Sequence, residues 1–264
     1  MMAEPINQQF YDKLFEDDEG ELLYNLLIEG KLKKMKRLVS GFEGRVLDVG
    51  CANCWTTQLF DRTKVEHFGV DISDNALKRA KEKGVIAKKV NLDDDPIPFE
   101  DKFFDLVLCA DIIEHTLYPE NVLREAKRVL KKGGSLIVVV PNIVAWFNRI
   151  LVLFGFYPWS VESTGTLELK DVFLHINDGH LRTYTKKSID ALLKIVGFEV
   201  QSYLGASLNV GTVIKKVDSR TDLVGMKGAL SCPIFVLKFN DVISRLFSLL
   251  PSFAPEIIVK ARKI

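Results

Sequence analysis

The sequence predicts an open, doubly wound α/β domain, in which helices cover both faces of a mostly parallel sheet. Short runs rich in valine, isoleucine and leucine alternate along the chain with longer runs of helical periodicity. The short runs are apolar on both of their faces, which is typical of parallel strands buried on both sides. The 264 residues, of which 47% are hydrophobic, are sufficient for one large core, and they contain no internal repeat.

The elements are expected in the following order. Leucines at helical spacing predict a leading helix, or a pair of helices, over residues 20–39, and the lysine-rich KLKKMKR inside it is expected to be a solvated face. Strands are expected at 45–49, 67–71, 85–90, 104–110, 135–141, 199–205 and 255–263. Helices are expected at 54–60, 73–84, 119–134 and 185–198, and the second of these begins at Ser73 or Asp74 and ends at Gly84.

Composition excludes several functional classes. The chain has 36 lysines and arginines against 35 acidic residues, so it lacks the basic field that nucleic-acid binding needs. Its four cysteines show no disulfide spacing, which indicates a reducing, cytoplasmic compartment. The first residues contain no apolar run, so no signal peptide is expected. The most apolar stretch, 143–159, is interrupted by Asn148 and Arg149 and is not a membrane-spanning helix.

The stretch VLDVGCANCW, residues 46–55, is the strongest indication of a binding site. In doubly wound sheets, ligands bind outside the carboxyl ends of the strands, where the strand order reverses. Gly50 permits a tight turn there, and the helix expected after it would direct free amide groups at a ligand. Asp48, just before the turn, would repel a pyrophosphate but attract an ammonium group. The site is therefore expected to bind a zwitterion, with amides for a carboxylate and Asp48 for an amine.

Further groups at the same edge extend this ligand. Asp71 lies 21 positions after Gly50, at the distance expected for an acidic partner of ribose hydroxyls, and Ile72 is placed to lie against a flat base. The cluster VNLDDDPIPF, residues 90–99, can hold an exocyclic amine. A ribose, an adenine and an amino-acid end together indicate S-adenosyl-L-methionine as the cofactor.

These stretches, together with GVDIS, FDLVLCADIIEHTLYPENVLREAKRVLKKGGSLIVVVPN and GHLRTYTKKSIDALLKIVGFEV, resemble the class I S-adenosylmethionine-dependent methyltransferase superfamily over residues 43–203. The resemblance implies a seven-stranded sheet whose last strand, at 255–263, is antiparallel. It also implies the cofactor-binding residues, which are Asp48, Gly50, Cys51, Ala52, Asp71, Ile72, Asn91, Leu92, Asp93 and Ala110. This cluster is one residue longer than the family pattern, so two pairs could bind the adenine edge. Asn91-Leu92, which is nearest the strand end, is preferred, and Asp93-Asp94 is the alternative.

Two residues of the loop depart from the glycine-rich pattern of the family. Ala52 adds one methyl group, whereas Cys54 is larger and is expected to lie where the following helix approaches the ligand. Cys51 and Cys54 also have a spacing found in metal-binding and redox sites. Further ligands and a thioredoxin-like context are missing from the sequence, so no metal is expected.

The acceptor side is defined by fewer residues. The candidates for a general base are His115, His175 and His180, and the candidates for substrate contacts are Trp159 and Arg182. Two apolar, aromatic insertions, 143–179 and 208–254, are expected to pack together as a lid. The alternatives are a bed for a lipid-like acceptor or a dock for peripheral contact with a membrane surface.

The expected organisation begins with an N-terminal helical segment over 1–42 and a cofactor-binding core over 43–203. The core carries the first insertion, 143–179, as an apolar lid. Residues 204–264 complete the same domain. The leading hypothesis is a methyltransferase for a small-molecule or lipid-like acceptor, working by in-line transfer in a desolvated pocket. The alternative is a non-catalytic protein that binds S-adenosylmethionine or a partner. A nicotinamide-dependent dehydrogenase is disfavoured by Asp48. The sequence indicates neither the acceptor atom nor the oligomeric state.

Overall fold

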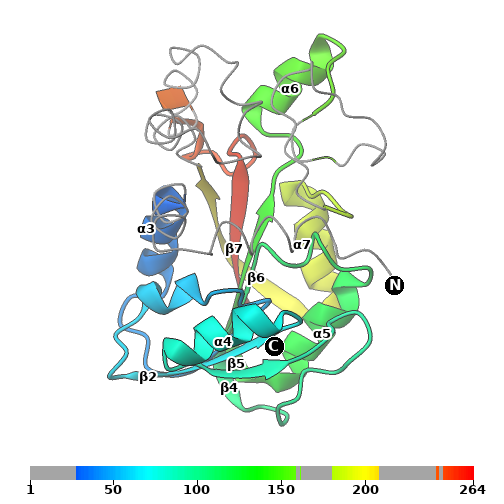
Figure 1. Ribbon diagram of the computed structural model, residues 1–264. Coiled ribbons are helices and arrows are strands. Elements are labelled where there is room, and N and C mark those ends of the chain that lie inside the picture. Colours follow the sequence, from blue (N-terminus) through cyan, green and yellow to red (C-terminus); the bar gives the residue numbers. More distant parts are fainter. Residues whose placement is uncertain (1–27, 159–160, 162–179, 208–241, 244–245) are drawn as a thin grey trace.

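A seven-stranded sheet forms the centre of the computed structural model, which describes residues 28–158, 161, 180–207, 242–243 and 246–264 (Figure 1). The strands are β1 (Gly44–Val49), β2 (Val65–Asp71), β3 (Ile86–Lys89), β4 (Phe104–Ala110), β5 (Leu130–Pro141), β6 (Phe198–Ala206) and β7 (Glu256–Lys263). Their order across the sheet is β3-β2-β1-β4-β5-β7-β6. Strands β1 to β5 are parallel, whereas β7 is antiparallel to both β5 and β6. The predicted fold class, including the antiparallel last strand, is confirmed.

Helices cover both faces of this sheet. They are α3 (Glu29–Leu38), α4 (Asp74–Glu82), α5 (Pro119–Val129), α6 (Trp146–Leu153) and α7 (Lys186–Val196), together with a five-residue 3₁₀ helix, η1 (Trp55–Leu59). Helix α3 lies on one side of the sheet, and α5 and α7 lie on the other (Figure 1). Val46 of β1 packs in the cluster that contains Met35 of α3, while Leu47 and Val49 pack in the cluster of α5 and α7. Because successive side chains of a strand point to opposite faces, both faces of β1 are buried.

The strand order reverses at β1, which pairs with β2 on one side and with β4 on the other. The register places Asp48 opposite Gly69 of β2 and Leu108 of β4. The loops that follow β1 and β4 therefore flank the position where doubly wound sheets bind their ligands.

The expectation that KLKKMKR is a solvated face is wrong for Lys31. Lys31 is 2% exposed, and its ammonium group lies 2.5 Å from the carboxylate of Asp111 and 2.7 Å from that of Glu256. It shares the buried stripe of α3 with Ile28 and Met35, at the spacing of one helix face. Sequence periodicity treats a lysine as polar, but here two carboxylates compensate for its buried charge.

The helix expected over 54–60 is the short 3₁₀ helix η1 instead. Cys54, immediately before it, has a left-handed backbone conformation with a φ of 54°, which an α-helix cannot include. The hydroxyl of Thr57 donates to the carbonyl oxygen of Cys54 at 2.9 Å. Because η1 is only five residues long, its dipole at the loop is smaller than that of the α-helix expected there.

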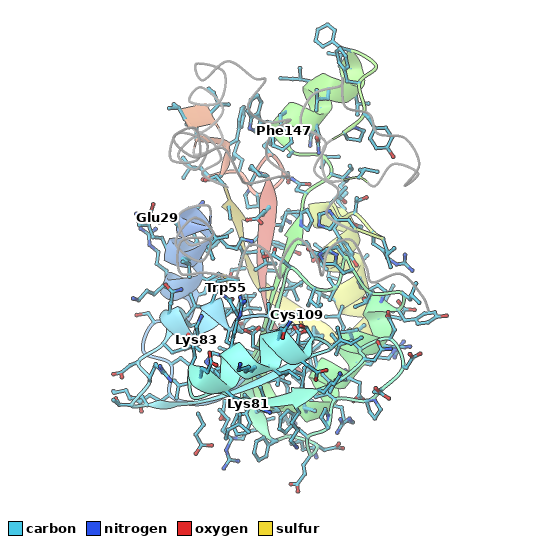
Figure 2. The ribbon with its side chains drawn as sticks, in the orientation of Figure 1. Glu29, Trp55, Lys81, Lys83, Cys109 and Phe147 are labelled. Atoms are coloured by element: carbon cyan, nitrogen blue, oxygen red, sulfur yellow. The ribbon has the colours of Figure 1, made fainter. Side chains whose placement is uncertain are left out.

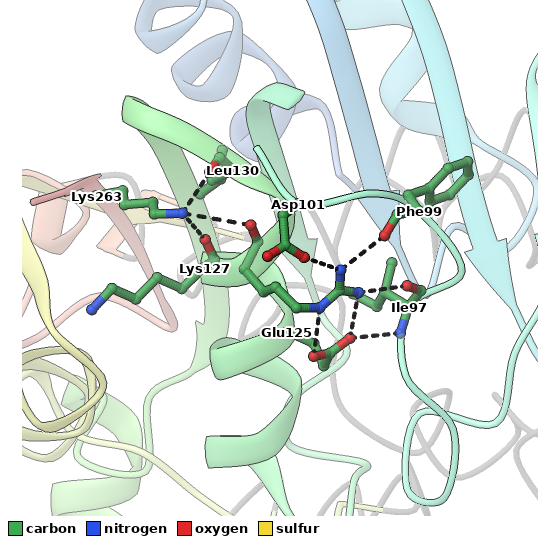
Figure 3. Close-up of polar contacts among 8 residues, drawn as sticks. Ile97, Phe99, Asp101, Glu125, Lys127, Leu130 and Lys263 are labelled. Atoms are coloured by element: carbon green, nitrogen blue, oxygen red, sulfur yellow. Dashed lines mark hydrogen bonds and ion pairs between the residues drawn. The ribbon is translucent and has the colours of Figure 1, made fainter. Parts of the chain in front are cut away.

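Helix α5 ends before the predicted residue 134, and Leu130 already begins β5. Lys263 of β7 donates to the carbonyl oxygens of Lys127 and Leu130, at 2.5 and 2.6 Å, which satisfies acceptors at the end of the helix (Figure 3). Arg128, in the same turn, is tied to the loop before β4 through the carboxylate of Asp101 at 2.7 Å. The end of this helix is therefore stabilised by residues that lie far away in the sequence.

Helix boundaries that carry local signals agree with their predictions. Ser73 caps α4, because its hydroxyl accepts a hydrogen bond from the amide of Ala76 at 3.2 Å. Helix α7 begins with a capping box formed by Thr185 and Ser188, and it ends at Gly197, whose φ is 91°.

Apolar segments extend beyond the carboxyl ends of the strands. Helix α6 follows β5 there, and Figure 2 shows Phe147 on this helix, remote from Trp55 and Cys109. The ring of Trp146 stacks on that of Phe247 with centroids 5.9 Å apart, so the described parts of the two insertions contact each other. None of the described helices is long and apolar enough to cross a membrane.

Candidate functional site

The loop over residues 50–54 begins with a turn that requires glycine. Gly50 has a φ of 69°, and a β-carbon built on it would lie 2.5 Å from the side chain of Ile112, in the loop after β4. The amides of Gly50 and Cys51 both donate to the carbonyl oxygen of Val70, at 2.9 and 3.0 Å. The loop is therefore fixed against β2 and against the loop after β4.

Asp71, at the end of β2, is oriented by main-chain groups. Its carboxylate accepts hydrogen bonds from the amides of Ala52 and Ser73, both at 2.9 Å. Burial raises the pKa of this carboxyl group, and the hydrogen bonds from Ser73 and Ala52 partly oppose that effect. Ile72, the next residue, is 56% exposed. A ligand that crosses this edge therefore meets a fixed carboxylate beside an accessible apolar side chain.

Asp48 is buried next to the same loop. It is 2% exposed, and its carboxylate accepts a hydrogen bond from the hydroxyl of Thr56 at 2.5 Å. Burial raises the pKa of Asp48 to about 7; the hydrogen bond from Thr56 lowers this pKa, and the carboxylates of Asp71 and Asp111 raise it. At neutral pH the charged and neutral forms are therefore close in free energy, and a nearby cation would favour the charged form.

The two cysteines of the loop pack into the core. Cys51 and Cys54 are buried in a cluster with Leu77 and Ala80 of α4. A β-carbon on Gly69 of β2 would lie 2.7 Å from Cys51 Sγ, so this glycine makes room for the thiol. A hydrogen bond with Cys54 and burial raise the pKa of the Cys51 thiol. Cys54, which was expected to lie where the following helix approaches the ligand, has its side chain buried in the core beneath α4.

Asn53, in the same loop, is a residue that sequence reasoning missed. Its side chain is 2% exposed, and neither its carboxamide oxygen nor its nitrogen has a hydrogen-bond partner among the described residues. A buried polar group left without a partner costs about 1–3 kcal/mol, so such a group indicates a missing ligand or water. The sequence does contain an indication of this residue, because Asn53 is the one amide side chain in the loop sequence GCANC. Together with Asp48 at the end of β1, Asn53 gives this loop polar groups that fit the amino-acid end of S-adenosylmethionine.

The loop after β3 carries the residues expected at the adenine edge. The side-chain amide of Asn91 donates to the carboxylate of Asp94 at 2.6 Å, and Asp93 accepts from the amide of Leu117 at 2.7 Å. Leu92 packs against the core, and with Asp93 and Asp94 it lines a hollow of about 210 Å³. Both candidate pairs, Asn91-Leu92 and Asp93-Asp94, thus lie within one turn of the chain.

A buried charge cluster follows Ala110, the last residue of β4. Asp111 pairs with Lys31, as described above, and Glu114 is 1% exposed. Burial, followed by the charge of Asp111, raises the pKa of Glu114 well above its ordinary value. Burial also raises the pKa of Glu256 to about 7, against the opposing effect of Lys31. Sequence reasoning missed this acidic cluster, although the position of Asp111 and Glu114 directly after a strand was a usable signal.

Two of the three candidate histidines lie together. The rings of His115 and His180 have centroids 4.8 Å apart. The amides of Leu181 and Arg182 donate to the carbonyl oxygen of Glu114, at 2.8 and 3.1 Å, and these bonds hold the two segments side by side. The main chain therefore brings His180 to the loop after β4, beside the acidic cluster.

Of the three remaining acceptor-side candidates, the structure describes only Arg182. The guanidinium group of Arg182 donates to the carbonyl oxygen of Leu117 at 2.5 Å, so it stabilises the loop after β4. His175 and Trp159 lie outside the described residues. Of the acceptor-side candidates, the structure therefore describes His115, His180 and Arg182.

A larger hollow, of about 580 Å³, lies away from this edge. Its lining includes Lys88, Phe99, Phe103 and Arg128, near the amino end of β4. Doubly wound sheets bind their ligands at the opposite, carboxyl edge. The candidate site is therefore taken to be at the polar groups described above rather than at this hollow.

Comparison with known proteins agrees with this geometry. Residues 47–138 match the family model described as a methyltransferase domain. Two uncharacterized proteins of Methanocaldococcus jannaschii are 35% and 37% identical over 128 and 145 residues, which are 48% and 51% of this chain. The chain spans 56% and 60% of the length of these two relatives.

A demethylmenaquinone methyltransferase of Listeria monocytogenes is 28% identical over 219 residues, which cover 72% of this chain and 90% of that protein. A solved structure from Thermotoga maritima, described as an S-adenosylmethionine-dependent methyltransferase and possible histamine N-methyltransferase, has a TM-score of 0.59 at 20% identity, over 97% of this chain and 99% of that one. Phosphoethanolamine N-methyltransferase 2 of Haemonchus contortus, solved with S-adenosyl-L-methionine, has a TM-score of 0.60 at 15% identity, over 99% of this chain and 60% of that one. At these identities the structures show a shared fold, while the family model matches the strands and loops that form the site. Residues 47–138 therefore match a methyltransferase domain, and the chain shares the fold of solved S-adenosylmethionine-dependent methyltransferases.

Proposed function

We propose that this protein transfers a methyl group from S-adenosylmethionine to a small or lipid-like acceptor at the carboxyl edge of the sheet. The observation that carries the proposal is the buried side-chain amide of Asn53, which has no partner among the described residues and lies in the loop between Asp48 and Asp71. When bound, S-adenosylmethionine supplies a methyl group that its sulfonium already activates. The protein then contributes alignment and a dry pocket.

Each end of the cofactor has a proposed partner. Asp71 accepts hydrogen bonds from the ribose hydroxyls, and the exposed Ile72 packs against the adenine. Asp48 binds the α-ammonium group, which favours its ionised form, and Asn53 donates to the carboxylate. Cys51, Ala52 and Ala110 contribute main-chain groups. For the exocyclic amine of adenine we prefer Asn91-Leu92 to Asp93-Asp94, because the first pair lies nearest the end of β3.

An apolar surface beside this edge supports an apolar acceptor. The apolar roof is defined here as residues 146–157 and 246–253. Leu153 and Phe154 of the roof are 78% and 71% exposed, whereas Phe247 stacks between Trp146 and Phe253. The Listeria relative is named for a demethylmenaquinone, which is an apolar ring compound. We propose that the roof closes over an acceptor of this class as a lid; docking on a membrane surface is the alternative use of the same side chains.

The polar groups below the roof would orient the acceptor. His180 and His115 are the described candidates for a general base, together with His175, where the acceptor must lose a proton. Arg182 is held near them through Leu117 and the carbonyl oxygen of Glu114, and Trp159 is the further candidate for a substrate contact. The free, buried thiols of Cys51, Cys54 and Cys109 support a reducing compartment such as the cytoplasm.

Turnover to S-adenosylhomocysteine tests this proposal. The purified full chain is incubated with S-adenosylmethionine and a demethylmenaquinone as the first acceptor probe, followed by fractions of a lipid extract and a panel of small amines and phenols. We expect product with at least one apolar acceptor, and loss of product in Asp71→Ala. Cofactor binding by calorimetry without turnover on any probe would instead favour the non-catalytic alternative.

A further inference from the structure

Glu114, His115 and His180 bring three side chains that commonly bind metals to one place. One ligand atom of each lies within 4.8 Å of the ligand atoms of the other two. The two imidazole rings are tilted by 47° to each other, so they do not stack face to face. Glu114 is buried, whereas both histidines are half-buried. The cluster therefore extends from the acidic interior toward the side from which an acceptor would enter.

Main-chain hydrogen bonds hold this cluster together. The carbonyl oxygen of Glu114 accepts from the amides of Leu181 and Arg182, next to His180. The amide of His115 donates to the carbonyl oxygen of Ile112 at 3.0 Å, which closes a turn in the other segment. The main chains of the two segments that carry the ligands are therefore held side by side, so that binding a cation requires movement of side chains only.

The surroundings of the cluster favour a positive charge. Glu114 Oε2 is buried and has no hydrogen-bond partner among the described residues. The carboxylates of Asp111 and Glu256 belong to the same acidic cluster, and Lys31 pairs with both of them. A buried carboxylate oxygen that lacks a partner is costly, and a bound cation removes that cost.

From this geometry we infer that Glu114, His115 and His180 bind a divalent transition-metal cation of the zinc type. Two imidazoles and one carboxylate are a ligand set of Zn²⁺ and neighbouring transition metals, whereas Mg²⁺ and Ca²⁺ prefer oxygen ligands. Ligand atoms that surround zinc at about 2 Å lie about 3.3 Å from one another, so the side chains must close in slightly on binding. Three protein ligands leave one position open, as in catalytic zinc sites.

The open position gives the cation a role in methyl transfer, and this part of the inference rests on the proposed function. Glu114 follows Ala110 by four residues, at the same edge of the sheet as the cofactor loop. The cation would bind an oxygen atom of the acceptor there and would lower the pKa of a bound hydroxyl group. Acceptors with an oxygen donor close to the methylated atom are therefore expected. The sequence led to the expectation that no metal binds, and this proposal departs from it, because only the fold brings His180 to Glu114 and His115.

Zinc titration of the chelator-treated full chain tests the inference in the absence of cofactor and acceptor. We expect one high-affinity Zn²⁺ per chain by calorimetry, and a Co²⁺ visible spectrum typical of a site with few ligands. His180→Gln and His115→Gln should each weaken Zn²⁺ binding at least ~tenfold, since even indirect partners of a metal contribute about that much. Glu114→Gln should do the same. The matched controls are His67→Gln, a half-buried histidine on β2, and Glu120→Gln, a carboxylate in the first turn of α5.

The outcomes separate the two proposals. If the protein binds no zinc, or if the three variants bind zinc as tightly as the controls, the metal site is wrong. The unfolding midpoint of each variant, measured without metal, distinguishes a lost ligand from a lost fold. If zinc binds as expected but no acceptor is methylated, the metal site stands and the proposed function fails. If methyl transfer proceeds equally in all variants after chelation, the role of the cation in transfer is excluded.

Discussion

The loop of residues 50–54 and the apolar roof lie at the same edge of the sheet, but different forces hold their side chains. Main-chain amides at 2.9 Å fix the carboxylate of Asp71. In the roof, ring contacts such as Phe247 on Phe253, with centroids 5.6 Å apart, lie beside side chains as exposed as Leu153, at 78%. Hydrogen bonds are directional and specify one ligand, whereas apolar contacts tolerate several. Under the proposed function, recognition of the cofactor is built into the strand ends, and recognition of the acceptor is left to an adaptable surface.

The strongest test of the rigid side of this comparison is Lys31→Met. The substitution keeps an apolar stem of similar length but leaves the buried carboxylate of Glu256 and the half-buried carboxylate of Asp111 without their cation. Removing one partner of a buried ion pair costs about 3–5 kcal/mol of the free energy of unfolding, which urea denaturation measures. Lys33→Met, on the same helix but in an exposed pair with Glu29, is the control and should change little. Equal effects of the two substitutions would show that the buried cluster does not stabilise the fold.

Asp71→Ala should weaken S-adenosylmethionine binding by roughly 1–3 kcal/mol, measured by calorimetry, the scale of a lost hydrogen bond to a charged group. The substitution removes the acceptor for the ribose hydroxyls and also the acceptor that orients the amide of Ala52. Asp74→Ala is the matched control, because this carboxylate is 79% exposed and pairs with Lys89. An unchanged affinity of Asp71→Ala would rule out the ribose assignment.

The third test uses pH. Asp48 has a pKa raised to about 7 by burial, and the proposed contact with the cofactor ammonium requires its ionised form. As pH falls below about 7, a proton must be released for each cofactor bound, so affinity should drop by about tenfold per pH unit, and it should level off above that pKa. Calorimetry at pH 5.5, 6.5 and 7.5 measures this slope.

Asp48→Asn should bind the cofactor more weakly at pH 7.5 and should lose most of the pH dependence. Glu256 also has a pKa of about 7, raised by burial, and it stays in place in this variant. A slope that persists in Asp48→Asn would therefore assign the titration to another group, such as Glu256.

The smallest expected effect tests the adaptable side. Phe154→Ser, in the roof, should raise the KM of an apolar acceptor about three- to tenfold and leave cofactor affinity unchanged, because partial burial of one aromatic ring is worth about 1 kcal/mol. Ile195→Ser on α7 is the control, since Ile195 is 72% exposed and Phe154 is 71% exposed. Loss of liposome binding in Phe154→Ser, with KM unchanged, would identify the roof as a membrane dock instead of a lid.

The predictable part of the molecule is the part that local patterns determine. The strands were predictable because they are apolar on both faces, and Asp48 and Asp71 because they stand at strand ends. The end of α5 was not predictable from local patterns, because it is stabilised by Lys263, which is 136 positions away from Lys127 in the sequence. The burial of Lys31 was not predictable, since the periodicity of apolar residues cannot reveal that two carboxylates from distant parts of the sequence pair with it.

The candidate site shows the same division. The backbone of Cys54 has a positive φ that no residue-type preference predicts, and this turns its thiol into the core. The neighbourhood of His115 and His180 depends on a tertiary contact through the carbonyl oxygen of Glu114, which no local pattern records. Asn53 was visible in the sequence, but its burial and its missing partners were not.

The position of β7 has a consequence for how the chain folds. Its residues pair with β5 on one side, Ser135 opposite Arg262, and with β6 on the other, and β6 joins the described sheet only through β7. These pairings close very long loops. The chain must lose the conformational entropy of those loops before the strand contacts can stabilise the sheet, and such topologies fold slowly. Strands β1 to β4 can assemble earlier from nearer partners. We therefore expect β5 to have an open edge, available for pairing with other chains, until β7 is inserted beside it.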